Sequence, residues 1–324
     1  MKNCNIIDTY KLQLFAGNLN TQTTGTGSLS DEMKTYYSDY LIDNAVPKLV
    51  HDQFGQKHPI PRNGGKTIEF RKYSPLPKLL TPLTEGVTPD GQSLTVTTLE
   101  ATVDQYGGYV TISDMLQMTA IDNNVVQATK LLGNQAGASL DTITREVLNG
   151  GTNVVYAGGK TSREALTASD KLTVDDIKKA VRALKNQNAE KIGDSFVAII
   201  HPDVTYDLTN DPTWQSVKDY DPKDWYEGEI GKIAGVRFVE TTEAKIFAGG
   251  VYSTLILGDN AYGVTEIEGG GLQHIVKQLG SAGTADALDQ RSTVGWKATK
   301  VAERLVEQFM VRIESKCTFA GAEN

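Results

Sequence analysis

The longest periodic pattern of apolar residues lies between Asp122 and Gly151. Its apolar positions recur at steps of three, four and seven, which places one stripe along a helix. Asp122 or a neighbouring Asn can cap the start, and the glycines at 150 and 151 favour the left-handed backbone that ends helices. We therefore predict a helix over residues 122–149, about 40 Å long. Its apolar stripe consists of Val125, Leu132, Ala136, Leu140, Ile143 and Val147.

Two further features of this helix bear on its packing. Asp141 and Arg145 stand four residues apart in the favourable acid-before-base order, so we expect them on the outer face. Gly133 and Gly137 each disfavour a helix interior by about 1 kcal/mol, which indicates close packing against a flat surface. The pattern is compatible with an ordinary long core helix or with a spine on which a β layer rests.

Between His51 and Asp114 the hydrophobic period falls to two. The segment Lys66–Arg71 is typical of one strand and Leu94–Val103 of another, because both alternate and are rich in Thr and β-branched residues. The run between them is interrupted by prolines and turn residues. We therefore predict a long β-hairpin with an irregular tip, after which residues 109–112 return to the body of the protein.

The rest of the chain gives weaker patterns. Residues 1–30 are polar and small and form an arm with no core of its own, and residues 33–46 have an amphipathic helical pattern. Thr173 begins a capping box for a helix, and the apolar run 196–200 is typical of a buried strand. Further strands are predicted at 236–240, 254–257 and 261–267. Residues 165–275 therefore form an α+β or α/β unit.

Two late segments, 293–301 and 309–314, also have the composition of strands. The second alternates well enough to be half-buried, so both need a partner surface. The predicted spine helix is the most obvious surface for them.

Charge on the predicted hairpin is divided between its two arms. Lys and Arg dominate positions 48–78, whereas positions 81–104 carry only acidic residues among their charged side chains. The two arms could pair with each other, or the hairpin could lie across a neighbouring subunit whose complementary charge sets its register. The candidate inter-subunit contact residues are Arg62, Lys66, Arg71, Lys72, Glu85, Asp90, Glu100 and Asp104.

Composition excludes several functions. The net charge of −8 disfavours a general nucleic-acid binder, because phosphate contacts need clustered Lys and Arg. Cys4 and Cys317 have no redox or metal-ligand spacing, which favours a reducing intracellular origin. The N-terminus lacks the pattern of a secretory signal, and no apolar run approaches the roughly 20 residues that span a bilayer. We expect a soluble protein made in the cytoplasm, with no membrane partner.

Candidate chemistry is sparse. Gly-Gly-Lys-Thr occurs at 64–67 and at 158–161, but both copies lack the earlier glycine of a phosphate-binding loop. His201, Asp203 and Asp207 could gather a divalent ion for a metal-dependent hydrolase, with Asp211 at helical spacing. We favour a simpler interpretation, in which Asp203 caps a short helix and the other acids face water. We assign no catalytic residue, metal ligand or cofactor.

Several runs resemble the major capsid proteins of tailed phages, specifically the N-four-like family. They are LSDEMKTYYSDYLIDNAVPKLVHDQFGQ (29–56), NGGKTIEFRKYSPLP (63–77), LTEGVTPDGQ (83–92), QYGGYVTISD (105–114), TREVLNGGTNV (144–154) and VGWKATKVAERL (294–305). The resemblance covers nearly the whole chain. It implies an α+β chain with the Hong Kong 97-type capsid fold.

The same resemblance implies a division of the chain. Residues 1–50 would be an N-terminal arm and 51–112 an extended loop formed by the hairpin. Residues 113–165 and 285–324 would form a peripheral domain around the spine helix 122–149, and residues 166–284 an α/β axial domain.

The function implied by the resemblance is structural. Subunits would assemble with themselves into pentamers and hexamers of an icosahedral shell, in the bacterial host cytoplasm. Implied partners are a portal, separate scaffolding or decoration proteins, and packaged double-stranded DNA contacted without sequence specificity. A nanocompartment shell of the same fold and, more remotely, the metal-dependent hydrolase are the alternatives. Closed symmetry would then set the copy number.

Overall fold

The computed structural model describes most of the chain beyond residue 49 and a short segment before it. The described residues are 21–22, 50–74, 76–82, 85–86, 88, 90–120, 124–214, 232–281, 286–319, 321 and 323–324. The chain divides into two compact units: unit 1 comprises residues 1–43, 108–133 and 274–296, and unit 2 comprises 44–107, 134–273 and 297–324. The amphipathic pattern at 33–46 lies outside the described residues. The predicted arm, loop, peripheral and axial domains stay predictions.

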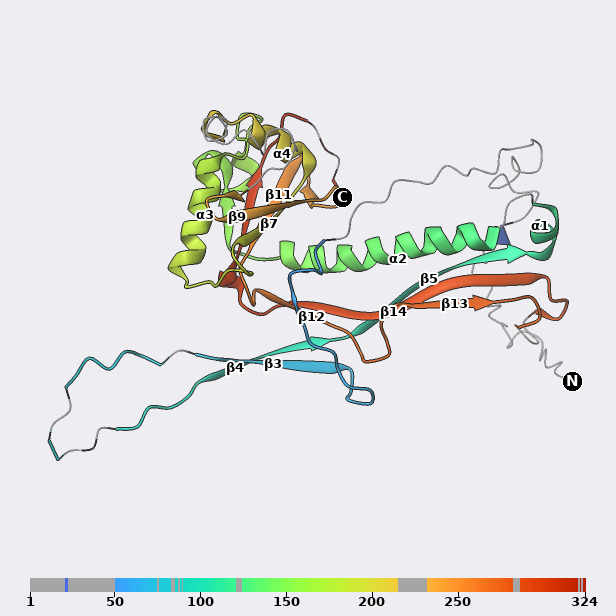
Figure 1. Ribbon diagram of the computed structural model, residues 1–324, viewed down its shortest axis with the longest axis horizontal. Coiled ribbons are helices and arrows are strands. Elements are labelled where there is room, and N and C mark those ends of the chain that lie inside the picture. The colour runs from blue at the N-terminus through green and yellow to red at the C-terminus, as the bar shows by residue number, and fades with distance from the viewer. Residues whose placement is uncertain are drawn as a thin grey trace, which may run out of the picture. The chain divides into compact units, whose positions relative to one another are not determined.

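The predicted hairpin is present in unit 2. Strands β3 (Thr67–Tyr73) and β4 (Val96–Thr102) pair antiparallel and form a two-stranded sheet of their own (Figure 1). The register places Thr67 opposite Thr102 and Tyr73 opposite Val96. The predicted bounds are within a few residues of these.

Unit 1 contains a helical turn and extended strands. Strand β5 (Asp104–Ser113) enters it and is met at Thr111 and Ile112 by the parallel strand β1 (Thr21–Gln22). Helix α1 (Asp114–Thr119) follows at once, and the Ser113 hydroxyl accepts a hydrogen bond from the backbone N–H of Leu116, which caps its start. Strand β13 (Gln273–Lys277) pairs with β14 (Arg291–Arg304).

Strands β5 and β14 approach closely at Gly295. A Cβ atom there would lie 2.9 Å from the Tyr109 Cβ and 3.0 Å from the Gly108 carbonyl oxygen. Glycine is therefore required at this position for the two backbones to come together.

The spine helix is present as α2 (Asn124–Asn149), within the residues described. Leu132 and Ala136 of the predicted apolar stripe are buried, whereas its other members are only partly buried. Leu148, which the predicted stripe did not include, is fully buried. Asp141 and Arg145, however, are buried too, so their placement on the outer face was wrong. A side chain at Gly133 would meet nothing within 4 Å, so close packing does not explain that glycine.

The largest sheet lies in unit 2 and has the strand order β6-β15-β11-β7-β9-β8, with β10 paired to β11. These strands are β6 (Val154–Tyr156), β7 (Phe196–Ile200), β8 (Lys232–Ile233), β9 (Val236–Glu240), β10 (Ile246–Phe247), β11 (Val251–Leu257) and β15 (Met310–Ser315). Strand β7 was predicted from its continuous apolar run, and all five of its residues are buried.

Helices cover one face of this sheet. Helix α3 (Val174–Asn186) begins at Thr173, whose hydroxyl accepts the Asp176 N–H as predicted, and α4 (Pro202–Thr209) follows β7 (Figure 1). Alternate residues of the strands point to this face and pack with both helices. They include Phe196, Ala198, Ile200, Tyr252, Ile256, Val311 and Ile313.

The opposite face of the sheet packs against the end of α2. Leu148 contacts a cluster that contains Ile199, Leu255 and Met310 together with Tyr262 of β12 (Tyr262–Thr265). Strand β12 pairs with β14 and with the short β2 (Gln56–Lys57). Successive side chains of β7 and β11 therefore point to opposite faces of the sheet and pack into two separate hydrophobic clusters.

The two late strands have different partners. Strand β14 contacts α2, because Lys300 donates to the Leu140 carbonyl and Arg304 to that of Val147. Strand β15 instead pairs with β11 and β6 in the large sheet, although its residues fall in the range assigned to the peripheral domain. The remaining short helical turns are η3 (Ala157–Gly159), η4 (Arg163–Ala165) and η6 (Glu307–Phe309). None of the helices in the described part of the chain is long and apolar enough to cross a membrane.

Candidate functional site

The outer half of the hairpin exposes apolar side chains. The base is anchored, because Ala101 is buried and the Phe70 ring contacts the His58 ring edge to face at 5.8 Å. Beyond this point the described residues of the hairpin up to Thr95 are all exposed, with Leu79 78% and Leu80 85% exposed. The other exposed apolar side chains of this region are Tyr73, Leu76, Leu94 and Val96. Contiguous exposed apolar surface on a soluble protein commonly marks an interaction site.

Most of the candidate charged residues form no ion pair with another described residue of the hairpin. Lys66 and Asp104 form one exposed cross-strand ion pair at 2.9 Å, and Arg71 pairs with Glu69 of its own strand. Glu69 lies directly opposite Glu100, so like charges face each other there. The other candidates have no ion-pair partner among the residues described: Arg62, Lys72, Glu85, Asp90 and Glu100. Pairing within the hairpin therefore accounts for only a small part of its divided charge.

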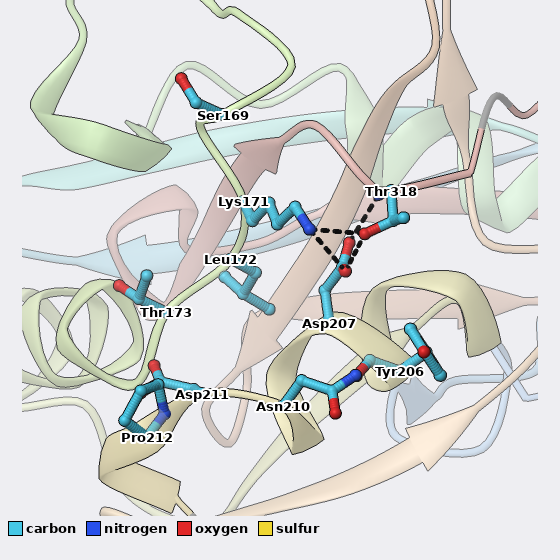
Figure 2. Close-up of a pocket in the computed structure, with 10 residues that line it drawn as sticks. All are labelled: Ser169, Lys171, Leu172, Thr173, Tyr206, Asp207, Asn210, Asp211, Pro212 and Thr318. Atoms are coloured by element: carbon cyan, nitrogen blue, oxygen red, sulfur yellow. Dashed lines mark hydrogen bonds and ion pairs between the residues drawn. The ribbon is translucent and has the colours of Figure 1, made fainter.

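A second candidate is a cavity of about 530 Å³ in unit 2. Figure 2 shows that the loop segment 169–173, the end of α4 and Thr318 after β15 contribute its walls. Lys171 Nζ lies 3.2 Å from Asp207 Oδ1, and the Thr318 backbone N–H donates to Asp207 Oδ2 at 2.7 Å. These contacts fasten three separate segments together at the edge of the cavity.

The contacts of Asp207 with Lys171 and Thr318 stabilise the fold and do not prepare Asp207 for catalysis. Burial alone would raise the pKa of Asp207, but hydrogen bonds from the Thr318 hydroxyl and backbone outweigh it, so the pKa lies below its usual value. A carboxylate held ionised by such donors is a poor general acid or base at neutral pH. Burial raises the pKa of the nearby Cys317 thiol to about 11, so this thiol is not a nucleophile either.

The contacts of Asp207 predict that the folded protein loses stability in acid. The pKa of Asp207 is lower in the folded protein than in the unfolded chain, where it is about 3.9. The contribution of Asp207 to the free energy of unfolding is therefore complete above the unfolded pKa, and it is lost as pH falls through the folded pKa. We expect Asp207→Asn to lower the free energy of unfolding by about 1–3 kcal/mol at pH 7. The difference in the free energy of unfolding between wild type and Asp207→Asn should become smaller near pH 3, as measured by urea unfolding. Asp175→Asn, an exposed control, should change little at either pH, and a deficit of Asp207→Asn that grows in acid contradicts the account.

Of the residues predicted as a remote metal site, His201 Nδ1 and Asp203 Oδ2 lie 3.3 Å apart, but Asp207 is bound by Lys171 and Thr318 instead. His201, not Asp203, caps α4: its Nδ1 accepts the Asp203 N–H at 3.1 Å. Burial lowers the pKa of His201, and the Asp203 charge only partly offsets this. Asp203 accepts the Tyr252 hydroxyl at 2.7 Å, and Asp207 is buried instead of facing water. No group of three potential metal-binding residues occurs in the described ranges.

Sequence reasoning missed the most buried ionic residues. Glu314 lies in β15, whose six residues are all buried, and His51 and Asp141 carry no motif. The only signal that could have pointed to them is a charged residue inside an otherwise buried pattern.

Known proteins resemble this chain over most of its length. A sequence model described as phage capsid protein matches residues 96–305. Among curated proteins, no sequence matches. The capsid protein structure of cyanophage P-SCSP1u has a TM-score of 0.66 at 13% identity and covers 94% of this chain and 100% of that one.

Two further structures give the same result. The cyanophage Pam1 capsid has a TM-score of 0.68 at 14% identity, covering 89% of this chain and 97% of that one. The capsid of Ralstonia phage GP4 has a TM-score of 0.66 at 15% identity, covering 89% and 96%. At such identities these structures establish the shared Hong Kong 97-type fold, and membership of the N-four-like group stays a prediction. Since the family model spans well over half of the sequence, the chain belongs to the phage capsid protein family and is a major capsid protein.

Proposed function

We propose that this protein assembles into pentamers and hexamers, which close an icosahedral shell around the double-stranded DNA of a tailed phage. The outer hairpin is the observation that carries the proposal. An isolated two-stranded hairpin is at best marginally stable, and this one presents apolar side chains to water. A neighbouring subunit would cover that apolar surface and hold the arm in place.

The divided charge of the hairpin would fix its position on that neighbour. Arg71 and Lys72 project from β3, where the opposing residues are Thr98 and Thr97. Arg71 has only an exposed ion pair with Glu69 of its own strand, so both positive charges would be accessible to carboxylates of another subunit. Complementary charge of this kind contributes more to register and partner choice than to affinity.

The remaining partners follow from the shell. A subunit with a net charge of −8 is compatible with packaged DNA, without sequence-specific contacts, when counterions balance most of the charge of the genome. A portal and separate scaffolding or decoration proteins would complete the particle, which would be built in the host cytoplasm. The match to phage capsid proteins favours a phage shell over a nanocompartment of the same fold.

The apolar tip gives a direct test. We expect Leu79→Ser/Leu80→Ser to lower the assembled fraction by at least about tenfold, because each buried Leu contributes about 1.5–3 kcal/mol to an interface. The stability of the subunit should change by less than about 0.5 kcal/mol, since both side chains are exposed. Sedimentation and electron microscopy report assembly, and urea unfolding reports stability. Leu79→Met/Leu80→Met keeps the apolar area and should assemble. Normal assembly by the serine variant would remove the tip from the proposed interface.

A further inference from the structure

Unit 1 contains an apolar groove that the proposed assembly does not use. The groove has a volume of about 410 Å³ and lies where α2 begins, beside β13 and β14. Among the residues that line it, Val294 is fully buried, whereas Val126 is 48% and Val276 44% exposed. Exposed apolar side chains gathered around a concave surface are typical of a site that binds another chain segment.

The polar residues of the groove narrow the choice of occupant. Lys277 is the only charged residue among the described residues that line it. Gln117 and Gln278 add side-chain amides, which can form hydrogen bonds with hydroxyl groups. The groove therefore suits a segment that has one apolar face, carries hydroxyl groups and has a negative net charge.

The sequence contains such a segment at residues 31–43, which lie outside the described residues. Four acidic residues and one lysine give this segment a net charge of −3. Three of its apolar positions are tyrosines, whose rings are apolar and whose hydroxyls bind polar groups. The spacing i, i+3, i+4, i+7 and i+8 is that of an amphipathic helix that binds in a groove. These positions are Met33, Tyr36, Tyr37, Tyr40 and Leu41.

The described chain brings this segment within reach of the groove. Gln22 of β1 lies opposite Ile112 of β5, and the Ile112 carbonyl accepts a hydrogen bond from the Ser292 hydroxyl of β14. Ser292 lines the groove, so β1 lies two strands, or about 10 Å, from its wall. Residues 23–32 can span roughly 35 Å, which allows Met33 to reach the groove. So short a tether favours docking within the same subunit over docking from a second copy.

We propose that residues 33–41 form a helix whose apolar face docks in the unit 1 groove of the same subunit. Lys277 then balances part of the negative charge of this helix. The hairpin tip of another subunit is a poorer occupant, because Lys72 and Lys78 would bring positive charge against Lys277. The inference concerns a single subunit and does not rest on the proposed assembly.

Hydrogen exchange of the purified full-length protein tests the docking. A wild-type peptide covering 33–46 should exchange at least about tenfold more slowly than an unstructured chain. Val276→Glu places a charge in the groove and should remove most of this protection. Ile275→Glu is the matched control and should keep it, because Ile275 is 37% exposed on the same strand and does not line the groove. Wild-type protein without protection, Val276→Glu with full protection, or equal loss in both variants overturns the proposal.

A second measurement needs no variant and identifies the subunit that supplies the helix. An amine-reactive cross-linker can join Lys34 of the segment to Lys277 of the groove. When ¹⁴N- and ¹⁵N-labelled subunits are mixed before assembly, the proposal requires cross-links between these two lysines that carry one isotope only. Cross-links of mixed isotope would show that a second copy fills the groove, and they would overturn the proposal. Absence of the cross-link also contradicts it.

Discussion

Reversing two charges on the hairpin, Arg71→Glu/Lys72→Glu, is expected to block shell assembly while the subunit stays folded. In an assembled shell the substitution would place like charges against the carboxylates of every neighbour, which costs several kcal/mol per contact. Within the subunit the loss is small, because Arg71 has only an exposed ion pair with Glu69. We expect the assembled fraction, measured by sedimentation and electron microscopy, to fall at least about tenfold.

A charge-preserving exchange provides the matched control. Arg71→Lys/Lys72→Arg keeps two positive charges on the same strand and should assemble close to normally. High salt should narrow the difference between wild type and the reversed variant, because exposed charges are screened. Assembly of the reversed variant at wild-type yield would contradict an inter-subunit role for these residues.

The second large effect concerns Glu314, whose side chain is 0% exposed. Arg163 donates to both of its oxygens at 2.7 Å, and this hydrogen bonding raises the pKa of Arg163. Arg312 Nε lies 2.9 Å from Oε1, but its N–H does not point at that oxygen. This contact is therefore an ion pair without a hydrogen bond. We expect Glu314→Gln to lower the free energy of unfolding by about 3–5 kcal/mol, because it leaves the buried Arg312 uncompensated.

Urea unfolding of Glu314→Gln checks this value against an exposed pair. Asp175 lies 2.8 Å from Lys179 and both side chains are exposed, so Asp175→Asn should leave the free energy of unfolding almost unchanged. Equal losses in the two variants would show that the buried pair adds nothing beyond an ordinary surface contact.

Elements set by local signals were predictable from the sequence. The run at 196–200 has no polar residue, so a strand buried on both faces was its natural structure, and the Thr173 hydroxyl capped α3 as its spacing predicted. The hairpin was also predictable, because two alternating segments are joined by a run of prolines and turn residues. Its register was not, because a connection of more than 20 residues between β3 and β4 does not fix which residues face each other. The apposition of Glu69 and Glu100 was therefore missed.

Burial of charged residues depended on distant partners and was not predictable. Periodicity treats Asp141 and Arg145 as outward-facing, yet their partners His51 and Glu243 come from segments 90 and 98 residues away. Asp207 was expected in water for the same reason, and it is buried because Thr318 returns to it from the end of the chain. The candidate inter-subunit contacts of the hairpin stay predictions, since the structure of one subunit contains no neighbour that could test them.

The most direct test of the account is electron microscopy of shells or rings formed by the full-length protein, at a resolution that traces residues 66–104. We expect pentamers or hexamers in which the hairpin of each subunit lies on its neighbour, with Leu79 and Leu80 covered and Arg71 and Lys72 facing carboxylates. Assembled particles in which residues 66–104 touch only their own subunit would contradict it.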